Sequence, residues 1–126
     1  MIAARTRAAR RRAARRGRAA EWLCCWRLRL FGWRIVARDW RCPVGEIDII
    51  ARRGRVLAIV EVKSRGDVGS AAAALLPRQR RRIGRAAAAF LATRPDLARL
   101  ALRFDVMLAA PRRAPRHLAD AWRGDE

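Results

Sequence analysis

The sequence has little of what many functional sites require. It contains one histidine, His117, and three cysteines, too few to assemble a Cys/His zinc site. The number of cysteines is odd, and their spacing is not that of a disulfide-bonded scaffold, so we expect free thiols in a reducing compartment. No run of about 18 apolar residues is present, so we expect no membrane-spanning helix, and no clear secretory signal is recognised. We therefore expect a soluble, cytoplasmic protein.

Acidic residues are also scarce. The chain has 11 of them against 30 basic residues, which gives a net charge of +19. Such an excess of positive charge favours nucleic acid as the partner, because a polyanion neutralises it. All but one of the basic residues are arginines, a bias also typical of a GC-rich genome. If genome composition explains the arginines, the positive charge does not indicate nucleic acid, and the partner is another protein.

The length of 126 residues, of which 52% are apolar, predicts one compact domain. Residues 1–20 carry eight arginines and no acid. We interpret residues 1–17 as an N-terminal Arg/Ala-rich extension, either a solvated tail or a phosphate-binding arm. Residues 18–126 then form a single domain.

Hydrophobic periodicity predicts an α/β fold with the order αβββαβ and a mixed sheet flanked by helices. The first helix runs from Ala19 to Gly32, with Trp22 and Trp26 assigned to the core; Trp33 and Trp40 are left open. The other expected elements are strands over residues 33–40, 46–51, 55–63 and 102–108, and helices over residues 70–76, 77–94 and 117–122.

Three acids, Glu46 among them, and the only lysine fall in one expected hairpin. Asp48 lies on its first strand, and Glu61 and Lys63 lie on its second. If Arg53 and Gly54 form the turn, Asp48 lies opposite Ile59 and diagonal to Glu61, so the three side chains share one face. A slip of one residue would send Asp48 to the other face.

Two converging carboxylates repel each other unless a cation joins them. Mg²⁺ or Mn²⁺ fits, because such hard ions take carboxylate oxygens, waters and phosphates as ligands. The metal would activate water and the phosphoryl group, with Lys63 orienting the water. The alternative is an ion pair of Lys63 with Glu61 or Asp48 on a solvated sheet face. Flanking residues such as Ile47 and Val62 favour burial, and hence the metal site.

The hairpin sequence GEIDIIARRGRVLAIVEVKSR (45–65) resembles the signature of the YraN family, bacterial proteins related to restriction-endonuclease-like and Holliday-junction-resolvase-like nucleases. Gly17–Glu21, Gly32–Arg41 and Arg103–Asp105 match further family segments, so the resemblance covers most of the chain. It implies a restriction-endonuclease-like fold and a PD-(D/E)xK-type site.

Residue by residue, the resemblance implies that Asp48 and Glu61 hold the metal and that Lys63 positions water. Glu21 matches an acid of the first helix that assists the metal. The implied activity is metal-dependent hydrolysis of phosphodiesters in DNA, at branched or other non-duplex structures. The alternative is a non-catalytic, basic nucleic-acid-binding protein with a degenerate nuclease fold.

The remaining candidates lie outside the hairpin. Five arginines could follow a phosphate backbone or simply coat a solvated helix: Arg65, Arg78, Arg81, Arg82 and Arg85. Asp105 is expected to pair with Arg103, and His117 to cap a helix or lie on the surface. Cys24 and Cys25 are expected to be small buried groups.

Overall fold

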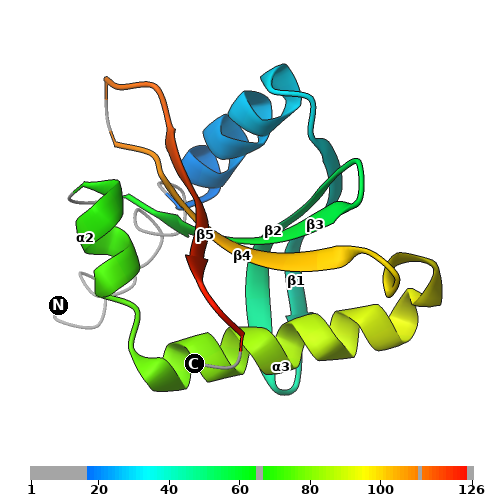
Figure 1. Ribbon diagram of the computed structural model, residues 1–126. Helices are drawn as coiled ribbons and strands as arrows, with labels where there is room; N and C mark the ends of the chain where they lie inside the picture. Colours follow the sequence, from blue (N-terminus) through cyan, green and yellow to red (C-terminus); the bar gives the residue numbers. More distant parts are fainter. Residues whose placement is uncertain (1–16, 65–66, 111, 125–126) are drawn as a thin grey trace, which may run out of the picture.

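The computed structural model describes residues 17–64, 67–110 and 112–124. Its centre is a five-stranded sheet with the strand order β1-β2-β3-β4-β5 (Figure 1). β3 and β4 are parallel and the other neighbouring pairs are antiparallel. The sheet is therefore mixed, which confirms the predicted α/β class. The strands are β1 (Arg34–Cys42), β2 (Gly45–Arg53), β3 (Val56–Lys63), β4 (Ala101–Leu108) and β5 (Arg116–Trp122).

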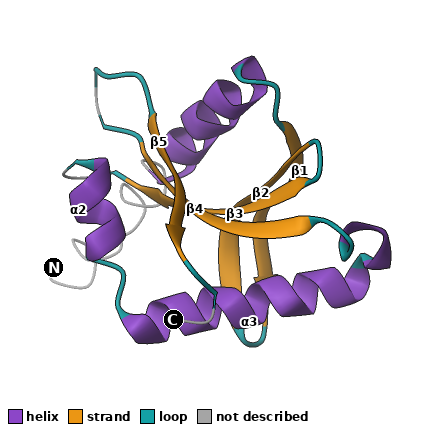
Figure 2. Ribbon diagram, in the orientation of Figure 1, coloured by secondary structure: helices purple, strands orange, loops and turns teal. Residues whose placement is uncertain are grey.

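Helices cover both faces of the sheet (Figures 1 and 2). The N-terminal helix, described over residues 17–30, lies on one side, and α3 (Pro77–Thr93) crosses the other. The short helix α2 (Val68–Ala73) packs beside β4 and β5, and the 3₁₀ turn η1 (Pro95–Leu97) leads from α3 into β4. The parallel β3–β4 pair requires such a crossover, since its two strands run in the same direction.

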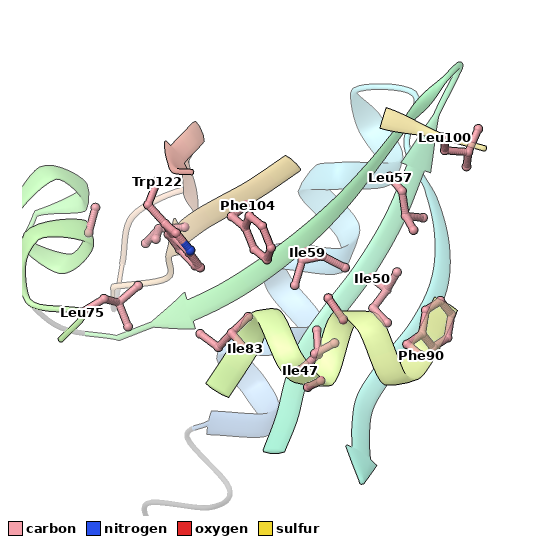
Figure 3. Packing of buried hydrophobic residues seen from close by; sticks show 14 of the residues in the cluster. Ile47, Ile50, Leu57, Ile59, Leu75, Ile83, Phe90, Leu100, Phe104 and Trp122 are labelled. Carbon is pink, nitrogen blue, oxygen red and sulfur yellow. The ribbon is translucent and has the colours of Figure 1, made fainter. Parts of the chain in front are cut away.

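The core on the α3 side follows the predicted periodicity (Figure 3). Ile83, Ala86, Ala87 and Phe90 are buried, as expected from the sequence. Phe90 meets the edge of Trp40 with ring centroids 5.4 Å apart. Pro77 opens the helix, where a missing N–H costs nothing. This helix therefore holds β1 and β2, and with β2 the first acid of the predicted site.

The N-terminal helix forms, but the prediction of its buried face was wrong. Trp22 and Trp26 are about half exposed, whereas Cys24 and Cys25 are buried as expected. The buried side of this helix consists mainly of small residues, which let it lie close to the sheet against β2 and β3. This helix carries apolar residues on two sides, so the sequence pattern did not determine which side is buried. A prediction based on side-chain size chose the side of the tryptophans, which is exposed.

The predicted last helix is also wrong, because residues 116–122 form strand β5 instead. β5 pairs antiparallel with β4, and Trp122 stacks on Phe104 with ring centroids 5.2 Å apart. The segment is rich in alanine and leucine, which favour a helix locally. Pairing with the otherwise open edge of β4 overrides that preference.

Trp33, which the sequence left open, is buried between the sheet and two cations. The guanidinium groups of Arg53 and Arg103 lie 4.5 and 5.2 Å from its ring centroid. Trp40 is half-buried and packs against the α3 side of the core. Neither Trp33 nor Trp40 is therefore as exposed to solvent as Trp22 and Trp26 of the N-terminal helix.

Candidate active site

The β2–β3 hairpin has a different turn from the one predicted. Arg53 pairs with Val56, so Gly54 and Arg55 are the two central residues, not Arg53 and Gly54. Gly54 has φ of +60°, and the first central position of a type II′ hairpin turn requires a positive φ. The register differs from the predicted one by two residues. Because strand side chains alternate with period two, the predicted sharing of a face survives the correction.

The observed register brings Asp48 level with Glu61 rather than Ile59. The last regular pair before them is Ile49 with Val60. Beyond it, the N–H of Val62 donates to Asp48 Oδ2 at 2.8 Å. A side-chain carboxylate thus takes the place of a main-chain acceptor at the end of the ladder. This bond fixes the orientation of the Asp48 carboxylate.

Glu61 joins Asp48 and Lys63 into one group. In the observed register Glu61 lies level with Asp48 on the neighbouring strand, and the charge of Asp48 acts on the Glu61 carboxyl group to raise its pKa. Lys63 Nζ lies 3.5 Å from Glu61 Oε1, and the two side chains keep 32% and 20% of their surface exposed. The structure therefore brings together three of the four predicted catalytic side chains, at the border between core and solvent.

Burial dominates the ionisation of the two carboxyl groups. It raises the pKa of Asp48, against the stabilising hydrogen bond from Val62 N–H. Burial also raises the pKa of Glu61, and the neighbouring charge of Asp48 raises it further, while Lys63 opposes both. Raised pKa values in two neighbouring carboxyl groups mean that both lack full compensation of their negative charge, which a cation could supply.

Glu21 reaches the same region from the N-terminal helix. Burial, followed by the charges of Asp48 and Asp39, raises the pKa of Glu21 to about 7. Its neighbours Gly17 and Ala20 line the cleft with it. The helix thus brings the third predicted acid into the region of the Asp48 carboxylate.

Glu21, Asp48 and Lys63 border a cleft of about 260 Å³ between the N-terminal helix and the ends of β1, β2 and β3, whereas Glu61 is not part of its lining. Sequence reasoning missed part of its wall. Arg41 holds Asp39 at 3.3 Å and Glu46 at 3.5 Å along one rim. Nothing in the spacing of these exposed residues signalled the arrangement. The complete lining is Gly17, Arg18, Ala20, Glu21, Asp39, Arg41, Glu46, Asp48, Val62, Lys63 and Ser64.

The predicted phosphate-binding arginines divide into separate groups. Arg78, Arg81, Arg82 and Arg85 are exposed on α3, on the opposite side of the sheet from the N-terminal helix. Arg82 lines a second, open groove of about 450 Å³ together with Arg41 and Glu46, which also line the cleft. Of these four arginines, Arg82 is therefore the one that lies next to the cleft. Arg65 lies outside the described residues.

The donors of the site fit a hard divalent cation. Asp48 and Glu61 supply carboxylate oxygens from adjacent strands, as Mg²⁺ and Mn²⁺ prefer. Within the described residues, no three His, Cys, Asp or Glu side chains form a ready-made metal-binding group. Magnesium sites commonly use only one or two carboxylates and complete the shell with waters and substrate phosphate.

The raised pKa values predict an unusual dependence of stability on pH. Glu21, Asp48 and Glu61 bind more protons in the folded than in the unfolded chain, so the free energy of unfolding falls as pH rises through 5 to 8. We expect a loss on the order of 3 kcal/mol, or ~10 °C in the melting temperature. Scanning calorimetry at pH 5, 6, 7 and 8 without metal measures it.

The same experiment has an internal control. The Asp48→Asn variant removes one titrating group and its charge on Glu21 and Glu61, so its melting temperature should fall less over this range, although burial still raises the pKa of those two acids. Mg²⁺ should stabilise the wild-type protein more at pH 8 than at pH 6, because metal and proton compete for the pair. A wild-type melting temperature independent of pH between 5 and 8 would contradict the assigned ionisation of the site.

Among the described residues, no helix is both long and apolar enough to span a bilayer.

Comparison with known proteins places the chain in a family. A UPF0102 protein of Parvibaculum lavamentivorans is 61% identical over 107 residues, covering 85% of this chain and 80% of the relative. One of Paramagnetospirillum magneticum is 52% identical, covering 87% and 88%, and one of Chelativorans is 46% identical, covering 96% and 98%.

The family model matches most of the domain that contains the site. It covers residues 20–109, from the N-terminal helix through β4. This match confirms the YraN resemblance drawn from the hairpin and its flanking segments. The chain belongs to the uncharacterised protein family UPF0102.

Proposed function

We propose that this protein is a metal-dependent nuclease that hydrolyses phosphodiester bonds in DNA, at branched or other non-duplex structures. The observation that carries the proposal is the half-buried pair of Asp48 and Glu61 on adjacent strands, with Lys63 Nζ 3.5 Å from Glu61 Oε1. Burial raises the pKa of both carboxyl groups, and groups with shifted pKa values cluster at functional sites.

Each side chain of the site has a distinct role in this proposal. Asp48 and Glu61 hold Mg²⁺ or Mn²⁺, and Glu21 serves as a further ligand or as an acid at the cleft wall. The bound cation would polarise the phosphoryl oxygen and favour ionisation of water. Lys63 orients the attacking water and balances the charge that develops on the phosphate. Val62 N–H keeps Asp48 aimed at the cleft.

The charge of the chain supports nucleic acid as the substrate. The net charge is +19, and Arg18 and Arg41 line the cleft beside the acids. Cations at the rim would contact phosphates flanking the bond that is cut, and each contact adds to the salt dependence of binding. Arg41 shares the rim with Asp39 and Glu46, so Arg18 is the cation of the cleft best placed to contact a phosphate directly.

The proposal is tested with a panel of labelled duplex, flap, four-way-junction and single-stranded DNA, with matching RNA. We expect cleavage of at least one non-duplex DNA that requires Mg²⁺ or Mn²⁺ and is abolished by EDTA. Cleavage by wild-type protein that equals the residual cleavage by Asp48→Asn protein would identify a contaminating nuclease. That result would overturn the proposal.

One observation favours a second function, a non-catalytic nucleic-acid-binding protein. Lys63 already pairs with Glu61, and Asp48 already accepts the Val62 N–H, so both carboxyl groups have a partner without a cation. Under this alternative, binding is tight and salt-sensitive but indifferent to metal and to Glu61→Gln. Calorimetric titration with Mn²⁺ in the presence of DNA separates the two functions, since only the nuclease should give a saturable, Asp48-dependent heat.

A further inference from the structure

The outer face of the N-terminal helix exposes large apolar side chains. Their exposed fractions lie between 41% and 79%, although the opposite face of the same helix is buried against the sheet. Exposed apolar groups that gather on one element commonly mark an interaction surface. We call this surface the outer face; it comprises Trp22, Leu23, Trp26, Leu30 and Phe31.

The rings of the outer face lie beside one another and beside cations. Trp22 and Trp26 meet edge to face with centroids 5.8 Å apart. The guanidinium of Arg29 lies 5.6 Å from the Trp26 centroid, and that of Arg27 lies 4.5 Å from the Phe31 centroid. An apolar protein helix or lipid tail would have to desolvate these guanidinium groups. Aromatic rings interleaved with arginines instead suit stacked bases joined by phosphates.

The outer face is continuous with the cleft through Arg18. Arg18 lines the cleft, and Trp22 and Trp26 follow it at intervals of four residues, which places the three side chains as successive neighbours along one helix. The row extends ~12 Å along the helix axis. A strand that leaves the acidic site past Arg18 therefore meets Trp22 first and Trp26 next.

We propose that the outer face is a base-stacking surface for unpaired, single-stranded DNA, centred on Trp22 and Trp26. Its role in substrate selection rests on the proposed nuclease function; its binding role does not. Bases stack on the two indoles while Arg27 and Arg29 neutralise the phosphates. Duplex DNA cannot use the surface in this way, because its bases already stack on one another. The surface therefore favours substrates with a single-stranded segment beside the cut.

Fluorescence anisotropy with a labelled oligothymidylate tests the proposal on the full chain, with EDTA present to prevent cleavage. Trp22→Ala and Trp26→Ala should each weaken binding by about 5-fold to 100-fold. Trp22→Phe should retain most of the affinity because it keeps a flat ring. Leu76→Ala is the matched control, since Leu76 is half exposed but precedes α3. Its affinity should equal that of the wild-type protein.

An abasic strand of equal length separates stacking from charge. It keeps the phosphates and lacks the bases, so wild-type protein should bind it more weakly than oligothymidylate, whereas the two alanine variants should show a smaller difference. Equal wild-type affinity for the two strands would overturn the proposal. So would alanine variants with unchanged affinity that convert a dimer into a monomer in sedimentation, since the outer face would then join two copies of the chain.

The stacking surface and the nuclease can fail separately. Asp96→Asn protein should bind oligothymidylate in EDTA as tightly as wild-type protein, since Asp96 lies in the turn after α3 and lines neither the cleft nor the outer face. If wild-type protein cuts no nucleic acid but loses affinity on Trp22→Ala, the surface stands and the nuclease proposal fails. If it cuts DNA but Trp22→Ala and Trp26→Ala leave both affinity and strand preference unchanged, the surface proposal fails alone.

Discussion

Replacing Asp48 by asparagine should lower metal-dependent DNA cleavage at least ~1000-fold, because loss of the cation forfeits several kcal/mol of transition-state stabilisation. The asparagine keeps the shape of the side chain. Its carbonyl oxygen can still accept the Val62 N–H, and its amide can donate to Glu61. The variant therefore resembles the protonated site and should fold normally. Initial rates on the best panel substrate, at saturating Mg²⁺, measure the effect.

The matched control for this prediction is Asp96→Asn. Asp96 is an exposed acid that pairs with Arg94 at 3.0 Å in the turn after α3, so its loss changes the net charge equally without touching the cleft. Its cleavage rate should match that of the wild-type protein. If Asp48→Asn retained more than a tenth of the rate while circular dichroism showed a folded protein, Asp48 could not be the metal ligand proposed here.

The hairpin could be predicted because its constraints are local. The alternation of polar and apolar residues along each strand determines which face of the sheet each side chain occupies. The glycine between the two strands locates the turn, and with it the register to within two residues. The turn was misplaced because Gly54 suits either central position, and only the strand pairing decides between them. Asp48 and Glu61 share a face in spite of the misplaced turn, because a register shift of two residues leaves each side chain on the same face of the sheet. The candidate site was therefore accessible from sequence even with the wrong register.

The cleft wall and β5 were not accessible because distant pairing sets them. Arg41 and Asp39 line the cleft only because β1 folds back along β2. Residues 116–122 become a strand only because β4 offers them an edge. Trp22 and Trp26 face outward because the small residues of their helix fit the sheet more closely. In each case, local propensity was consistent with more than one outcome, and packing selected among them.

A second aspartate, Asp105, is buried in β4 and should have the largest effect on stability. It is fully shielded from solvent. Arg103 donates two hydrogen bonds to it at 2.9 Å, His117 Nε2 lies 2.7 Å away, and Asp120 N–H donates at 2.9 Å. Burial opposes its ionisation, but these partners hold the pKa of Asp105 below its ordinary value. The predicted Arg103 pair is thus present, and His117 contributes to it rather than capping a helix.

Asp105→Ala should lower the free energy of unfolding by ~3–5 kcal/mol, since it leaves Arg103 and the Asp120 N–H without their buried acceptor. Urea unfolding followed by circular dichroism measures the loss. This exceeds the expected cost of any change in the cleft, because the Asp105 side chain bridges β4 and β5 where their register shifts between Phe104 and Val106.

Asp105→Asn separates charge from shape at this position. Asparagine keeps one oxygen for the Asp120 N–H but cannot accept both Arg103 bonds, so its loss of stability should lie between those of wild-type and Asp105→Ala protein. A midpoint for Asp105→Ala equal to that of the wild-type protein would show that β5 docks without the carboxylate. The contrast with Asp48 is physical. Asp105 has enough cationic and N–H donors to remain ionised, whereas Asp48 and Glu61 hold their charge poorly, as a site that binds a cation reversibly requires.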